Sequence, residues 1–312
     1  QLDTTGKCPT VNNDGSVNVT SAESENSLLC SASDAYGTSY YYRGNVTNNY
    51  VKFANFYWRI VRINGDGSIR LMYDGTTAHA NSEASDNRII GTSPFNENYN
   101  DNAYVGYMYG TPNSSTYEET HANINDSTIK KYIDLWYENN LKDTAYEQYL
   151  ADNIFCNDRS FSTNNSGTGS KTDLSYYRWN WAPWNSENYN REMLLTCPQQ
   201  NDGFTVNDTK NCNGSLNYPI GLLNEDEILL AGGWNIPNNS FYLYSGQTWW
   251  SLSPIHYKGA HARGRRVDLN GYANDATEME GVLGVRTVVS LKSNSLKSGD
   301  GTINNPYMVN SE

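Results

Sequence analysis

The side chains with the greatest chemical variety lie close together, in residues 249–272, WWSLSPIHYKGAHARGRRVDLNGY. Two of the four histidines occur here with the cations Lys258, Arg263, Arg265 and Arg266, although the formal net charge of the chain is −12. Guanidinium groups bind carboxylates, phosphates and sulfates through paired hydrogen bonds, and imidazoles titrate near neutral pH. This composition suits the recognition of an anionic partner.

Small residues and chemically varied residues share the segment from residue 255 to residue 281. Glycine and alanine let the backbone turn, while the longer side chains offer donors, ring faces and imidazoles. We expect the rest of the molecule to hold this backbone, so that its side chains neither enter the interior nor pair mainly with the chain's own acids. A solvated basic loop is the alternative interpretation. The predicted ligand-binding residues are Trp249, Trp250, His256, Tyr257, Lys258, His261, Arg263, Arg265, Arg266, Asp268, Asn270, Tyr272 and Asn274.

Motifs for catalysis do not accompany this segment. The sequence has no phosphate-binding loop, dinucleotide-binding fingerprint or HExxH motif, and His79 and His121 lie alone in polar stretches. The acids Glu225, Asp226 and Glu227 follow an asparagine, where they suit the positive end of a helix dipole. We therefore predict no enzymatic activity, no cofactor and no metal. A hydrolase would require a cleft with a strongly perturbed carboxylate.

Charge and hydropathy limit the class of protein. A pI near 4.8 opposes binding to nucleic acid and to anionic membranes. No apolar run approaches the roughly 20 residues that a membrane-spanning helix needs. We interpret the start at Gln1 as that of a trimmed extracellular domain at the cell surface, attached to a membrane only through an N-terminal anchor missing from this sequence.

The five cysteines predict disulfides. None lies in a CxxC pair, which disfavours a zinc site. Cys8 and Cys30 flank a polar loop that a disulfide between them would close. The other three allow Cys156–Cys197 or Cys197–Cys212 with one thiol left over, and we favour Cys156–Cys197. Disulfides indicate an oxidising, extracellular compartment.

Short strands and a few helices must position these groups. Aromatic and β-branched runs predict strands in residues 36–75, and INGDGSI predicts a hairpin turn in which Asp66 serves the turn rather than a calcium ion. The run GVRTVVSLK predicts a central strand, and helices are expected where a capping residue precedes an apolar stripe. The predicted strands are residues 40–43, 50–53, 56–63 and 68–73, and the predicted helices begin near 127, span 144–153 and follow Asn224.

Five stretches occur in the order found in a known family: YYYRGNVTNNYVKFANFYWRIVRINGDGSIRLMYDG, NYPIGLLNEDEILLAGG, YLYSGQTWWSLSP, GVRTVVSLK and SGDGTINNPYMV. The chain resembles bacterial surface proteins with a C-type-lectin-like fold of the formylglycine-generating-enzyme type, and most closely the variable proteins diversified by retroelements. The resemblance implies an α+β, loop-rich domain over residues 36–312, with short antiparallel strands and helical insertions within about 76–215. Residues 1–35 would form a flap closed by the first disulfide, and residues of about 255–281 would form the variable ligand-binding region.

In that family a tryptophan-bearing strand and a final GVR strand bracket the segment rewritten by mutagenesis, and residues 249–254 and 284–286 match this frame. The resemblance implies a surface-displayed adhesin or receptor whose partner is a protein or an anionic glycan on another cell or on a phage. A pilin-like or surface-layer subunit that self-assembles is the alternative. Enzymes with this fold oxidise a cysteine with copper held by two thiols, and the C-terminal third here offers no cysteine pair. This too argues against an enzyme.

Overall fold

The computed structural model describes residues 8–19, 27–163, 166–179, 191–234, 236–273 and 275–309. Strands dominate this structure, with 36% strand and 13% helix. They form a large curled sheet, a second sheet of six strands and three small ribbons. The predicted α+β class with helical insertions is therefore wrong, because few segments of this aromatic, Asn-rich chain keep a helical stripe and most backbone groups bond in strands and turns.

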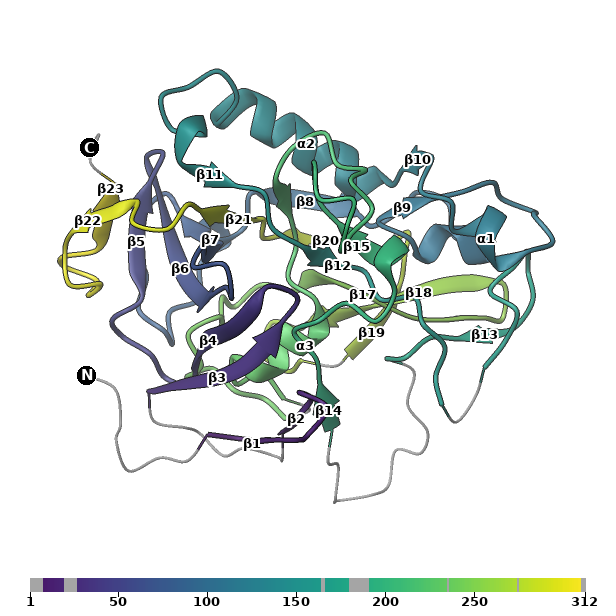
Figure 1. Ribbon diagram of the computed structural model, residues 1–312, viewed down its shortest axis with the longest axis horizontal. Coiled ribbons are helices and arrows are strands. Elements are labelled where there is room, and N and C mark those ends of the chain that lie inside the picture. Colours follow the sequence, from purple (N-terminus) through teal and green to yellow (C-terminus); the bar gives the residue numbers. More distant parts are fainter. Residues whose placement is uncertain are drawn as a thin grey trace.

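The large sheet has ten strands, in the order β11-β21-β7-β6-β5-β23-β22, with β4 and β3 continuing from β6 (Figure 1). The short strand β16 pairs with β21. The predicted strands 50–53 and 56–63 are confirmed as β5 and β6. The run GVRTVVSLK supplies β21, which is central as predicted because it pairs with β7, β11 and β16. The strands are β3 (Leu28–Asp34), β4 (Gly37–Arg43), β5 (Tyr50–Phe53), β6 (Phe56–Ile63), β7 (Ile69–Gly75), β11 (Leu150–Ala151), β16 (Ile220–Gly221), β21 (Val288–Leu291), β22 (Leu296–Ser298) and β23 (Tyr307–Val309).

The turn between β6 and β7 depends on Asp66. Its Oδ1 accepts hydrogen bonds from the backbone N and the hydroxyl of Ser68, at 2.9 and 2.6 Å. Gly67 adopts a φ of +82°, which favours glycine. Asp14 and Asp300 make the same pair of bonds to the residue two positions on. Turn donors therefore occupy these carboxylates, as predicted for Asp66.

The second sheet has six strands, in the order β19-β18-β17-β20-β8 with β13 beside β17. β17 and β18 form a long hairpin, which lies at the opposite side of the molecule from β22 and β23 (Figure 1). Only Arg286 and Thr287, both fully buried, separate β20 from β21, so the chain passes directly from this sheet into the large one. The strands are β8 (Gly91–Pro94), β13 (Ser175–Tyr176), β17 (Trp249–Lys258), β18 (His261–Val267), β19 (Asp275–Glu278) and β20 (Val282–Val285).

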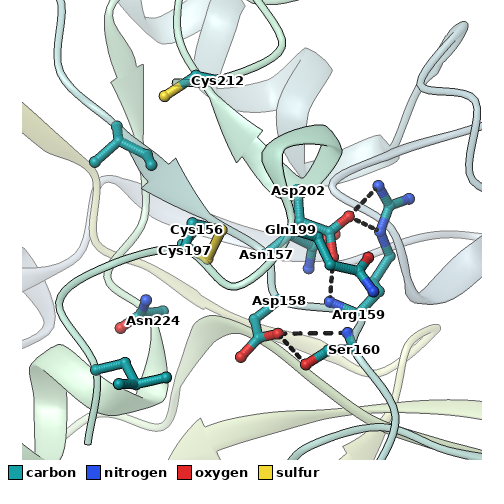
Figure 2. The surroundings of a disulfide bond; sticks show 12 residues. Cys156, Asn157, Asp158, Arg159, Ser160, Cys197, Gln199, Asp202, Cys212 and Asn224 are labelled. Carbon is teal, nitrogen blue, oxygen red and sulfur yellow. Dashed lines mark hydrogen bonds and ion pairs between the residues drawn. A yellow bond between two sulfur atoms is a disulfide. The ribbon is translucent and has the colours of Figure 1, made fainter. Parts of the chain in front are cut away.

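Three ribbons and two disulfides complete the β structure. Cys8–Cys30 and Cys156–Cys197 both form, with Cα–Cα distances of 5.5 Å, and both predicted pairings are confirmed. Figure 2 shows Cys212, a buried free thiol, apart from the Cys156–Cys197 bridge. The ribbons are β1 (Thr10–Val11) with β2 (Val17–Val19) and β14 (Arg191–Met193), β9 (Met108–Tyr109) with β10 (Asn125–Asp126), and β12 (Phe155–Cys156) with β15 (Gly203–Phe204).

The described residues contain three α-helices: α1 (Tyr117–Thr120), α2 (Thr128–Asn140) and α3 (Glu225–Leu230). Of the two cap candidates for α2, Asp126 and Ser127, the structure uses Ser127, and the predicted cap Asn224 is confirmed by its capping box with Glu227 in α3. The predicted helix at 144–153 is wrong. Only Glu147–Tyr149 form a 3₁₀ turn, because the residues after it pair with β21 as β11. Among these helices, none is both long and apolar enough to cross a membrane.

Buried arginines connect the elements of the core. Arg286 contacts Asp74 of β7 at 2.9 Å. Arg62 and Arg70, from β6 and β7, contact Glu227 of α3 at 3.1 and 2.6 Å. Since a buried charge is costly unless it is paired, these contacts fix α3 against the large sheet. Glu227 of the first turn of α3 therefore serves the structure, as predicted for these acids, and it also holds two arginines from distant strands.

Candidate functional site

A row of four side chains crosses the second sheet near the tip of the long hairpin. Tyr176 of β13 pairs with His256 of β17, His256 pairs with Arg263 of β18, and Arg263 pairs with Glu278 of β19. Directly paired residues of neighbouring strands project from the same face of a sheet. The register therefore places an aromatic ring, an imidazole, a guanidinium and a carboxylate side by side on one face.

The hairpin ends in a two-residue turn. Gly259 and Ala260 have φ values of +62° and +66°, which match a type I′ turn. Lys258 is exposed before this turn and pairs with His261 after it. No heavy atom lies within 4 Å of a Cβ built on Gly259, so the tip points into open space. The turn therefore presents the side chains of Lys258 and His261 at the end of the molecule.

His261 is held between an aromatic ring and two carboxylates. Its ring stacks on Tyr99 with centroids 4.8 Å apart and an interplanar angle of 8°. Its Nδ1 lies 3.3 Å from Glu280 Oε1 and 3.7 Å from Glu278 Oε1. Arg263 donates to Glu278 Oε1 at 2.8 Å, and these two side chains keep 40% and 39% of their surface exposed. The expectation that this segment would not pair with the chain's own acids is wrong for His261 and Arg263.

Four of the predicted ligand-binding residues lie in the interior. Trp249 and Trp250 are fully buried, and Tyr257 and Arg265 are nearly so. Trp250 donates its Nε1 hydrogen to the carbonyl of Ser93, and Arg265 donates to the carbonyl of Trp179. The prediction that these four contact a ligand is wrong, because residues 249–255 of β17 are buried on both faces of the strand and Arg265 is covered where its guanidinium meets Trp179. Only Tyr257 is turned inward between more exposed neighbours.

The remaining predicted residues are Arg266, near the end of β18, and residues that follow this strand. Asp268 accepts hydrogen bonds from the backbone N of Asn270 and of Tyr272, at 2.8 and 2.9 Å, and so organises a turn. Asn270 is exposed, whereas Tyr272 and Arg266 are half-buried. Asn274 lies outside the described residues. Arg266, Asp268, Asn270 and Tyr272 lie at or beyond the end of β18 that is far from the hairpin tip, so the predicted site is divided between two places.

The environment of His256 differs from that of His261. Burial, together with the positive charges of Arg263, Arg265 and Lys258, lowers the pKa of His256 to about 4. Its ring lies edge-on to Tyr176, with centroids 6.0 Å apart. His256 is therefore neutral at physiological pH. It contributes a polar ring rather than a charge to this face.

Two features of the described residues bear on catalysis, a buried carboxylate and a pocket. Burial raises the pKa of Asp226 to about 6, but its carboxylate is engaged by Arg178 and by the backbone N of Leu194. A pocket of about 660 Å³ is lined by residues that include Glu118 and Phe161, and no histidine or cysteine lines it. Asp226 does not line this pocket, so the perturbed carboxylate and the cavity are formed by different residues.

Tyr99 of this face was missed from the sequence, whereas Glu278 and Glu280 lie in the predicted region 255–281 but were not among the named ligand-binding residues. Tyr99 is far from the hairpin in the sequence but adjacent to it in space. The backbone N of Ala262 donates a hydrogen bond to the carbonyl of Tyr99, at 2.7 Å. The two glutamates belong to β19 and the turn after it, and only the pairing register places them beside His261. No local pattern reveals such a register. We call Tyr99, Lys258, His261, Arg263, Glu278 and Glu280 the hairpin-tip face.

Comparisons with known proteins found no relative of this chain. No protein-family model matches the chain, and no curated protein or solved structure is similar to it.

Proposed function

We propose that this chain is a non-enzymatic binding protein displayed outside the cell, and that the hairpin-tip face contacts a partner protein. The observation that carries the proposal is a rigid frame with varied side chains on its outer side. Trp249, Trp250 and Leu252 anchor β17 in the core, while Lys258 and Arg263 remain accessible. Binding residues typically lie at loop tips positioned by such a scaffold.

The balance of charge favours a protein over an anionic glycan. The cations Lys258 and Arg263 are matched by the anions Glu278 and Glu280 on the same face. A face with balanced charges does not concentrate a polyanion, whereas interleaved charges beside an accessible tyrosine are typical of protein interfaces. Tyr99 is 37% exposed and supplies that ring.

The two disulfides support a location in an oxidising compartment. We extend the proposal to the diversification that the resemblance implies. At the outward positions of this face a substitution removes contacts at the surface only, so the sequence there can change without loss of the fold. The buried tryptophans of β17 do not have this freedom, because truncating them would leave a cavity.

The test compares two triple variants of the purified chain on an array of cell-surface proteins and glycans, at low and high salt. Lys258→Ser, Arg263→Ser and Glu278→Ser together alter the face. Lys131→Ser, Lys297→Ser and Glu118→Ser make the same change of charge at exposed sites elsewhere.

We expect the face variant to lose affinity for a protein partner by at least about tenfold and the control to keep it. Equal retention by both variants would contradict the proposal. Binding confined to anionic glycans and abolished by salt would replace the protein partner with a glycan. Filaments seen by electron microscopy at high concentration would favour the structural subunit instead.

A further inference from the structure

Three side chains of the hairpin-tip face carry donor atoms that metals prefer. His261 Nδ1, one oxygen of Glu278 and one oxygen of Glu280 all lie within 4.8 Å of one another. Donor atoms around a tetrahedral zinc ion, with bonds of about 2.0–2.1 Å, lie roughly 3.3 Å apart. The distance from His261 Nδ1 to Glu280 Oε1 is 3.3 Å, and that to Glu278 Oε1 is 3.7 Å. Small side-chain rotations bring all three atoms to one ion.

We propose that His261, Glu278 and Glu280 form a binding site for a divalent transition-metal ion such as zinc. One imidazole nitrogen and two carboxylate oxygens suit zinc better than calcium, which takes oxygen donors alone. Three protein ligands leave at least one coordination position for water or for a group of a partner. This inference does not rest on the proposed function, because the ion binds to the chain by itself.

The second oxygen of Glu280 gives an independent reason. Oε2 is inaccessible to solvent and accepts no hydrogen bond in the structure. A carboxylate oxygen removed from water without a donor is costly. A cation held by both oxygens of this carboxylate would remove that cost, whereas the contact between Oε1 and His261 leaves Oε2 without a partner, although the side chain as a whole is 28% exposed. The orphaned oxygen thus marks a missing positive partner at this cluster.

The backbone holds the three ligands in place before an ion arrives. Met279 N donates to the carbonyl of Ala262 at 3.0 Å, and Gly281 N donates to the carbonyl of Glu278 at 2.9 Å. Stacking on Tyr99 fixes the plane of the His261 ring. A site on two paired strands with one stacked ligand loses little conformational entropy on binding.

Arg263 opposes the ion and provides a diagnostic variant. Its guanidinium contacts the same Glu278 oxygen that the ion would bind, at 2.8 Å. Removing this cation frees the ligand oxygen and lowers the local positive potential. We therefore expect Arg263→Gln to bind zinc more tightly than the wild type, whereas a merely structural ion-pair cluster predicts no gain.

The experiment titrates zinc chloride into the untagged chain by calorimetry and cobalt chloride with detection by visible absorption. We expect one saturable site in the wild type, a loss of at least about tenfold in affinity for His261→Ala and for Glu280→Gln, and a gain for Arg263→Gln. Glu118→Gln, at an exposed acid elsewhere, is the matched control and should bind as the wild type does.

Circular dichroism and thermal unfolding verify that each variant is folded. Absence of saturable zinc binding by the folded wild type would overturn the inference. Binding that survives both His261→Ala and Glu280→Gln would place the ion elsewhere and overturn it equally. Neither outcome bears on the partner array, which can be run with a chelator present.

Discussion

Replacing His256 by glutamine tests the electrostatic environment of the row of four side chains that crosses the second sheet. The imidazole is half-buried, and the cations Arg263, Arg265 and Lys258 add to the effect of burial on its pKa. The folded protein therefore binds the His256 proton less tightly than the unfolded chain does. Because of this difference, the contribution of His256 to stability is complete above pH 6.5 and declines as the pH falls from 6.5 towards 4.

The size of the effect follows from the pKa values. The pKa is 6.5 in the ordinary state and about 4 in the fold, and each pKa unit corresponds to about 1.4 kcal/mol. Integration from pH 7 to pH 5 gives a loss of about 2 kcal/mol in the free energy of unfolding that is due to His256 alone. His256→Gln lacks the titrating group and should not show this part of the loss.

Urea denaturation at pH 8, 7, 6 and 5 measures this difference. We expect the stability difference between wild type and His256→Gln to be constant from pH 8 to pH 7 and to shift by about 2 kcal/mol in favour of the variant at pH 5. Other titrating groups, such as Asp226 with its raised pKa, are present in both proteins and cancel. Parallel curves over the whole range would refute the reasoning.

Three further predictions concern the core, each measured as the free energy of unfolding in urea. Cys197→Ser opens the bridge to Cys156 and should cost about 4 kcal/mol in the loop-entropy estimate, and an unchanged midpoint would contradict a formed disulfide. Trp250→Ala should cost about 3–5 kcal/mol through the cavity it leaves, whereas a loss below 1 kcal/mol would indicate an exposed ring. Asp202→Asn leaves Arg159 buried without its charged partner, as Figure 2 illustrates, and should cost about 3–5 kcal/mol; a neutral result would show that the pair is dispensable.

Elements with local signals could be predicted from the sequence. Ser127 and Asn224 cap their helices through bonds to residues three positions on, so the signal and the structure lie within one turn. The β5–β6–β7 meander follows from aromatic runs separated by turn residues. The helix predicted at 144–153 does not form, because Leu150 and Ala151 pair with β21 and this pairing outweighs the helix propensity of the segment.

The candidate site could be predicted only in part, because its geometry depends on pairing between distant segments. The segment 255–281 contains Lys258, His261 and Arg263, which do lie at the exposed hairpin tip. Which neighbours turn inward depends on the strand register, and a one-residue change of register reverses every side chain. The irregular pairing between Trp250 and His256 adds a further shift that composition does not encode.

The direct passage from β20 to β21 has a mechanical consequence. A partner that pulls on the hairpin tip applies tension to β17, and β17 pairs with β20 in parallel at Trp249 and Gly284. The load then passes through two buried residues into β21, whose backbone is bonded to neighbours on both sides. Traction at the hairpin tip would therefore reach the large sheet through the pairing of β17 with β20 and the two-residue connection to β21, with no loop between the two sheets.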